Sequence, residues 1–152
     1  MEKYEKLASE LSIKKTIKSL NENGIEVFLT KNSDEAKKQA LKLIPRGSEV
    51  LTMTSVTLDT SGIGSEINES EKYISIRKKL NSMDRNTQGQ KMNKLGAAPK
   101  FAIGSVHAVT EEGHILIASK IQEANYLLMF MGLKMSYLSS EQIKSLKTLM
   151  RG

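Results

Sequence analysis

Hydroxyl side chains crowd one short segment near the middle of the chain. Thr52, Thr54, Ser55 and Thr57 follow a predicted strand and precede a predicted helix. In open α/β sheets, small molecules bind outside the carboxyl ends of the strands, where hydroxyls can donate and accept hydrogen bonds. The segment therefore predicts a site for a small polar or anionic ligand. The alternative is structural: Ser55 caps the helix, and the threonines suit a strand because they are β-branched.

A Ser–His pair forms the second candidate site. The apolar pattern predicts a strand over residues 101–110, which places Ser105 and His107 on one face because side chains two apart point the same way. A histidine beside a serine suggests a general base. No acidic partner is placed by spacing, however, and no GxSxG elbow is present. The alternative is a structural histidine in a strand, and the motifs identify no catalytic residue.

Other residues of suitable type are weaker candidates. Gly62 and Gly64 form an isolated GxG motif, which is typical of an ordinary loop. The polar stretch over residues 66–69 could orient a substrate or could be a solvated loop. Asp84 has the type of a helix N-cap, and Arg85 could pair with the carboxylate of a ligand.

Helices and strands alternate around these candidates. A helix is predicted over residues 4–23, in two pieces that break near Ser12 and end at Gly24. Strands over residues 25–31 and 48–54 flank a helix over residues 34–44, which suits a right-handed crossover between parallel strands.

Polar helical pieces are expected from residue 55 to Pro99, before the strand over residues 101–110. A hairpin turn at Glu111, Glu112 and Gly113 then leads to a returning strand over residues 114–119. Glycine at the third turn position suits the left-handed conformation.

Composition narrows the possible chemistry. The chain of 152 residues contains no cysteine and only two histidines, which excludes disulfides, thiol nucleophiles and thiolate-bound clusters or zinc. From its length we expect one domain, and from its lack of cysteine and its two histidines we expect no metal site. We also expect no membrane partner, because no long apolar run or leader pattern is visible. The expected location is the cytoplasm.

The formal net charge is +6, from 23 basic and 17 acidic residues. The lysines are distributed along the chain and interleaved with acidic residues, and aromatic residues make up only 5% of the chain. Stacking on bases needs aromatic side chains. We therefore expect solvated charged faces and no binding to nucleic acid.

Two long runs resemble the LUD-domain family of lactate-utilisation proteins, which includes lactate utilisation protein C. They are residues 52–70 (TMTSVTLDTSGIGSEINES) and 78–119 (KKLNSMDRNTQGQKMNKLGAAPKFAIGSVHAVTEEGHILIAS). The resemblance implies a Rossmann-like, mostly parallel sheet with flanking helices, of the NagB/RpiA/CoA-transferase type. Its characteristic stretches imply a ligand-facing set made of Thr54, Ser55, Thr57, Gly104, Ser105, His107, Thr110, Glu111 and Gly113.

The resemblance also implies a role in oxidising lactate to pyruvate, with a small anionic metabolite as ligand and iron–sulfur oxidoreductase subunits as partners. It names no cofactor for this chain. Two alternatives remain open. One is a non-catalytic partner subunit of an iron–sulfur oxidoreductase complex, and the other is an enzyme of the same fold that transfers acyl groups or CoA or performs ATP-dependent ligation.

The tail after Ser119 departs from the family pattern, so we expect a single domain over residues 1–152 that is family-like only over residues 1–119. If the codons from Leu128 onward are read one base out of frame, a permitted choice gives YVYGAKNVISIVGTNQILKDANER, close to the family's sequence. We therefore expect a frameshifted gene, a missing last strand, weak stability and little ligand binding, because an unpaired sheet edge destabilises the fold.

Overall fold

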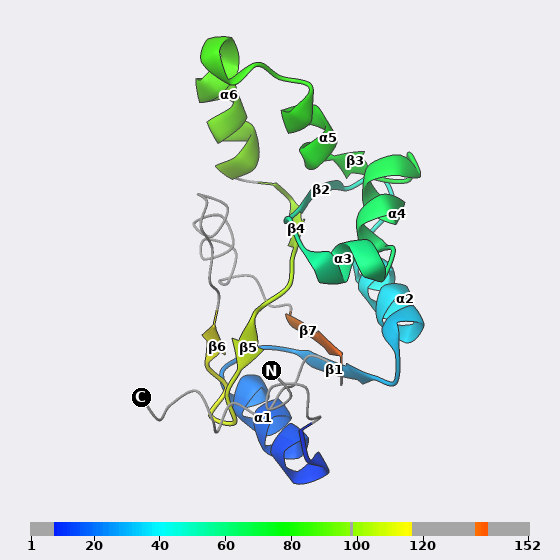
Figure 1. Cartoon of the computed structure of the whole chain (residues 1–152), viewed down its shortest axis with the longest axis vertical. Coiled ribbons are helices and arrows are strands. Elements are labelled where there is room, and N and C mark those ends of the chain that lie inside the picture. Colours follow the sequence, from blue (N-terminus) through cyan, green and yellow to red (C-terminus); the bar gives the residue numbers. More distant parts are fainter. Residues whose placement is uncertain (1–7, 98, 117–135, 140–152) are drawn as a thin grey trace. The chain divides into compact units, whose positions relative to one another are not determined.

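The computed structural model describes residues 8–97, 99–116 and 136–139 (Figure 1). These residues form two compact units. The first holds residues 8–36, 106–116 and 136–139, and the second holds residues 37–97 and 99–105. Within the described residues, no helix combines the length and the apolar character that crossing a membrane requires.

The first unit contains one long helix, a parallel strand pair and a hairpin. Helix α1 spans Glu10–Glu22, and strand β1 (Val27–Thr30) pairs in parallel with β7 (Ser136–Ser139). Strands β5 (Ala108–Val109) and β6 (Ile115–Leu116) pair antiparallel and form the predicted hairpin. Strand β7 lies in the tail, so the expectation that the tail supplies no last strand is wrong over Ser136–Ser139, which pair with β1.

Local capping sets both ends of α1. The Ser9 hydroxyl accepts a hydrogen bond from the Ser12 backbone N–H at 3.2 Å, so the helix begins earlier than the predicted break. The predicted break at Ser12 is wrong, because Ser12 lies within the continuous helix. At the other end, Gly24 has a φ of +78°, and the Ile25 N–H donates to the Leu20 carbonyl at 2.9 Å, which confirms the predicted glycine stop.

The buried face of α1 explains why its apolar pattern is misleading. The face carries Ser12, Thr16 and Leu20, whereas Leu11 is 65% exposed. The two hydroxyls are tolerated inside because both are hydrogen-bonded: Thr16 donates to the Ser12 carbonyl at 3.0 Å, and Ser12 donates to Glu111. A prediction based only on apolar residues therefore places two apolar stripes on one helix.

The second unit is built on a parallel sheet with the strand order β3-β2-β4. The strands are β3 (Ile74–Ser75), β2 (Glu49–Thr52) and β4 (Phe101–Ile103). Five helices accompany them: α2 (Ser33–Leu43), which begins in the first unit, α3 (Val56–Thr60), α4 (Ile63–Glu69), α5 (Ile76–Asn81) and α6 (Arg85–Ala97). The fold is therefore mixed α/β with a parallel sheet flanked by helices, as the Rossmann-like class predicts.

The core of the second unit lies between the sheet and helices α2, α3 and α4. Val50 of β2 is fully buried and packs with Ala40, Ile44, Leu58 and the two isoleucines of α4. Those isoleucines, Ile63 and Ile67, are four residues apart and so share one helix face. This spacing overrides the polar composition that predicts a loop at residues 66–69.

Two further predictions are corrected by strand pairing. Among the described residues, β1 pairs only with β7, while β2 pairs with β3 and β4, so the predicted crossover does not join two strands of one described sheet. The strand predicted over residues 101–110 is two strands in different sheets. The chain changes partners between them: the Ile103 carbonyl accepts from the Met53 N–H of the β2 side, whereas the His107 N–H donates to Leu116 in the hairpin.

Candidate functional site

Two serines meet where neighbouring parallel strands end. Ser55 follows β2 and Ser105 follows β4, and their hydroxyl oxygens lie 2.7 Å apart. The strands align Thr52 with Ile103, so their carboxyl ends are level. The sheet therefore brings together two of the predicted ligand residues that are 50 positions apart in sequence.

Ser55 also has the structural role that the sequence leaves open. Its hydroxyl accepts a hydrogen bond from the Leu58 N–H at 3.2 Å and caps α3, and the residue is 7% exposed. The capping bond uses an oxygen lone pair, so the hydroxyl hydrogen still takes part in the contact with Ser105 or with another acceptor. Capping and ligand contact are thus compatible at this residue.

A polar network of side chains from α4, β3 and α5 supports the end of β2. The Thr52 hydroxyl hydrogen-bonds with the Asn68 side chain at 3.1–3.2 Å, and Ser75 donates to the Asn68 oxygen at 2.6 Å. The Arg77 guanidinium donates to the Thr52 carbonyl from Nε at 2.9 Å and from Nη2 at 2.6 Å. These bonds hold the last residue of β2 against α4 and α5.

Sequence reasoning missed Ser75 and Arg77 and placed Asn68 in a loop. Ser75 ends the short strand β3 and caps α5 by accepting from the Lys78 N–H at 3.0 Å. A serine just before the apolar residue that begins a helix is an N-cap signal. No sequence pattern predicts the partner of Arg77, because Thr52 is 25 positions away.

The nine predicted ligand residues are divided between the two units. The second unit holds Thr54, which is exposed, together with the half-buried Thr57 and Gly104 and the Ser55–Ser105 pair. The first unit holds the other four, which are His107, Thr110, Glu111 and Gly113. His107 is exposed and does not share a strand face with Ser105, because residues 104–107 are not in a strand.

The hairpin residues of the set make well-defined contacts within the first unit. Thr110 is 3% exposed, and its hydroxyl accepts from the His114 N–H at 3.1 Å. Glu111 accepts a hydrogen bond from Ser12 and lies 3.7 Å from the Lys15 ammonium, while its backbone carbonyl accepts from Ser19 at 2.8 Å. Glu111 thus connects the hairpin turn to α1.

Gly113 occupies a position that other residues could not take without strain. Its φ is +81°, in the left-handed region. A Cβ there would lie 2.9 Å from the Asn23 side-chain nitrogen, 3.0 Å from the Ser19 backbone carbon and 3.1 Å from the Leu20 nitrogen. The predicted turn glycine is confirmed. The position requires glycine for two reasons, the left-handed backbone and the close approach to α1.

Glu66 of α4 has a lowered pKa. The first cause is the hydrogen bond from the Lys72 ammonium at 2.6 Å, and Lys37, at 4.0 Å, adds a second positive charge nearby. Glu66 is therefore held as a carboxylate in a surface ion pair. Within the described residues, no three His, Asp or Glu side chains lie together as a metal site would require.

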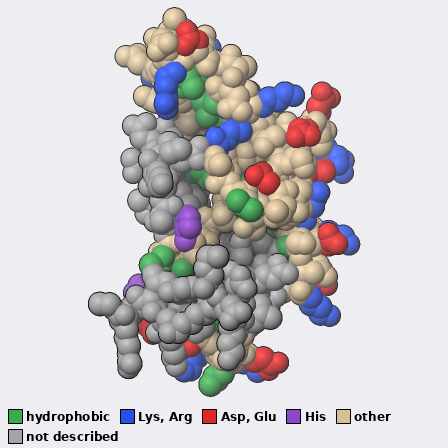
Figure 2. Space-filling model, in the orientation of Figure 1, with side chains coloured by type: hydrophobic (Ala, Val, Ile, Leu, Met, Phe, Trp, Pro, Cys, Tyr) green, Lys and Arg blue, Asp and Glu red, His purple; other side chains and the backbone are tan. Residues whose placement is uncertain are grey.

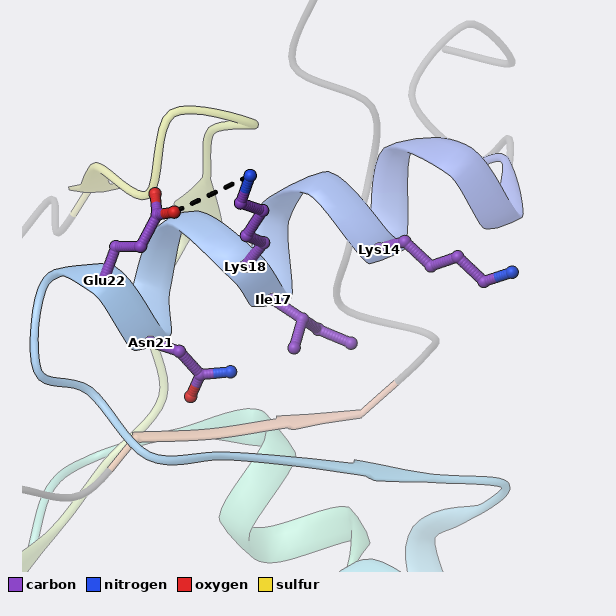
Figure 3. Close-up of a pocket in the computed structure, with 5 residues that line it drawn as sticks. All are labelled: Lys14, Ile17, Lys18, Asn21 and Glu22. Carbon is purple, nitrogen blue, oxygen red and sulfur yellow. Dashed lines mark ion pairs between the residues drawn. The ribbon is translucent and has the colours of Figure 1, made fainter.

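A hollow of about 560 Å³ lies along α1, outside the predicted ligand set. Figure 3 shows its lining residues projecting from the helix, with Lys18 and Glu22 paired across one turn at 3.7 Å. The lining consists of Lys14, Ile17, Lys18, Asn21 and Glu22. Four of these five are exposed, so the hollow is an open surface feature.

Comparison with known proteins identifies the family of the chain. The family model of the LUD domain matches residues 13–134, which includes both hydroxyl-bearing strand ends and the hairpin and extends beyond Ser119. No curated protein and no solved structure matches the chain. Because the family match covers most of the sequence, the chain belongs to the LUD-domain family, which is associated in general with lactate utilisation.

Proposed function

We propose that this LUD domain acts in the system that oxidises lactate to pyruvate, and that it binds a small anionic metabolite at the carboxyl ends of β2 and β4. The observation that carries the proposal is the contact between the Ser55 and Ser105 hydroxyls at 2.7 Å. Parallel α/β sheets bind their ligands at this end of the strands.

The chemistry of the pair suits an anion. Two hydroxyls in contact share one hydrogen, which leaves the second hydrogen available for an outside acceptor. A carboxylate accepts such hydrogen bonds more strongly than a neutral oxygen does. The ligand-facing set implied by the family resemblance, from Thr54 to Gly113, includes both serines, and Ser105 is half-buried. Lactate and pyruvate are therefore suitable first ligands to test.

Titration of the purified chain tests this proposal. We expect lactate or pyruvate to raise the thermal midpoint, because a ligand that binds only the folded state stabilises it. CoA esters, nucleotides and folates are titrated in parallel. A shift with CoA esters or nucleotides alone would instead favour acyl or CoA transfer or ATP-dependent ligation.

Substitutions then locate the bound ligand. Ser105→Ala removes one hydroxyl of the pair, and we expect affinity to fall about five- to tenfold, as for the loss of one hydrogen bond. Ser82→Ala is the matched control, because Ser82 is exposed and donates only to the Lys79 carbonyl, at 2.8 Å. Unchanged affinity in Ser105→Ala would place the ligand elsewhere.

A non-catalytic partner subunit is the second candidate. The chain has no cysteine, so a thiolate-held iron–sulfur cluster in the same system would have to sit on another protein. Co-purification with a cluster-bearing subunit, together with no ligand-induced thermal shift, would favour this function over metabolite binding.

A further inference from the structure

The net positive charge of the chain is concentrated in one segment. Residues 76–100 contain seven basic side chains and one acidic side chain, a net charge of +6, which equals the formal net charge of the whole chain. Elsewhere, basic and acidic residues balance. The expectation of evenly distributed charge therefore holds for the number of lysines but not for the net charge.

This segment forms helices α5 and α6, which we call the basic arm (residues 76–100). Helix α5 is anchored to β2: Arg77 donates to the Thr52 carbonyl, and Lys79 lies 3.2 Å from Glu49. The acidic residue Asp84 caps α6 by accepting from the Asn86 N–H at 3.0 Å and from Thr87 at 3.1 Å. The acidic side chain of the arm therefore forms its hydrogen bonds with residues of the arm itself.

Most of α6 faces solvent. Of its residues, only Gly96 is buried, and Met92 and Leu95 are half-buried. Five cations of the arm are exposed and form no ion pair with any carboxylate that the structure describes. They are Lys78, Arg85, Lys91, Lys94 and Lys100. A helix that is polar on nearly all sides gains little from its own packing, so the exposed cations of α6 are left facing solvent.

We propose that the basic arm is a docking surface for an acidic protein. Charge complementarity identifies the partner's sign, since five exposed cations would face carboxylates. Met92 and Leu95 add the apolar part that protein interfaces place inside a polar rim. Figure 2 shows basic and apolar side chains next to one another over the part of the surface that α6 occupies.

The arm suits a protein better than a nucleic acid. Residues 76–100 contain no Phe, Tyr or Trp, so the arm has no platform on which bases could stack. The apolar side chains of Met92 and Leu95 would gain no favourable contact from a sugar–phosphate backbone, which is polar and charged. At protein interfaces, by contrast, methionine is enriched. The arm proposal does not depend on the Ser55–Ser105 site, so the two can fail separately.

A defined peptide tests the arm. The full chain is titrated into a fluorescent helical peptide that carries glutamates on one face and leucines on the other, with polyglutamate and a short DNA duplex as comparison probes. We expect salt-dependent binding, tightest for the amphipathic peptide. We expect the double variant Lys91→Gln/Lys94→Gln to weaken it about fivefold, from two lost surface ion pairs.

Matched variants separate docking from bulk charge. Lys14→Gln/Lys18→Gln removes the same charge from α1 and is expected to leave peptide affinity within about twofold. Met92→Gln is expected to weaken the amphipathic peptide but not polyglutamate. Thermal midpoints of all variants check folding.

Three results would overturn the proposal. They are absence of peptide binding, equal loss in the α1 and α6 double variants, and a DNA affinity that matches or exceeds that of the peptide. The last result would assign the arm to nucleic acid.

Discussion

Two residues at the hairpin turn are implied as ligand residues and also hold the turn against α1, and a sequence pattern cannot separate these two roles. Gly113 is implied as a ligand residue by family resemblance, and a Cβ added there would also meet the backbone of α1. Glu111 is implied in the same way, and it contacts Ser12, Lys15 and Ser19. Tests at these positions therefore need controls that share the backbone conformation or the charge.

Gly113→Ala should destabilise the first unit strongly. Both the left-handed φ of +81° and the approaches of 2.9–3.1 Å oppose a Cβ, so we expect a loss of about 2–4 kcal/mol in the free energy of unfolding. Gly24→Ala is the matched control, since its φ is +78° with nothing within 4 Å. It should cost only about 1–2 kcal/mol. Equal losses in urea denaturation would show that close approach to α1 does not matter.

The Glu66–Lys72 pair should stabilise the protein at neutral pH and not in acid. The hydrogen bond from Lys72 lowers the folded-state pKa of Glu66. Its stabilisation is therefore complete above the unfolded-state pKa and is lost as pH falls through the lower, folded-state pKa. Lys72→Gln should lower stability slightly at pH 7, and the difference from the unchanged chain should vanish in acid.

The control is Lys38→Gln, because Lys38 is exposed and no ion pair involves it in the described part of the chain. Urea midpoints measured across the acid range at low salt check the prediction, since salt screens an exposed pair. A difference that persists below the folded-state pKa of Glu66 would contradict the assigned cause.

Elements show where local pattern suffices and where it does not. The stop of α1 at Gly24, the Ser55 cap of α3 and the hairpin turn at Gly113 are predicted from sequence because each depends on a few adjacent residues. The division of residues 101–110 into two strands is not predicted, because it depends on a change of pairing partner. The Ser55–Ser105 contact lies between these cases: the strand ends are predictable, but their adjacency is a matter of sheet order.

Docking of the hairpin onto α1 should depend on Glu111. Glu111→Ala would leave the Ser12 hydroxyl, in a residue that is 8% exposed, without its acceptor, and we expect a loss of about 1–2 kcal/mol in unfolding free energy. Glu112→Ala, which removes the same charge at an exposed position, should cost less than about 0.5 kcal/mol. If both variants unfold at the same denaturant concentration, the contact with Ser12 does not stabilise the hairpin.

At the scale of the whole molecule, the net charge and the family match are each confined to a part of the chain. The excess positive charge lies in residues 76–100, and the LUD-domain match covers residues 13–134. Beyond that match, β7 pairs with β1 over Ser136–Ser139. With the same permitted choice of codons, the shifted reading frame gives Ile-Ser-Ile-Val over these four residues. Three β-branched residues would thus stand where this chain pairs Ser-Tyr-Leu-Ser with β1.

The nucleotide sequence of the gene should therefore contain an open frame, one base out, that encodes YVYGAKNVISIVG from Leu128 onward. A chain with that frame restored should unfold at a midpoint higher by about 5 °C or more, because isoleucine and valine, which favour strands, would replace Ser136 and Ser139 in the strand that pairs with β1. It should also bind the proposed anionic ligand more tightly than the present chain. A stop codon or an unrelated sequence in that frame would contradict the frameshift. An unchanged midpoint would show that the tail as encoded supports β1 equally well.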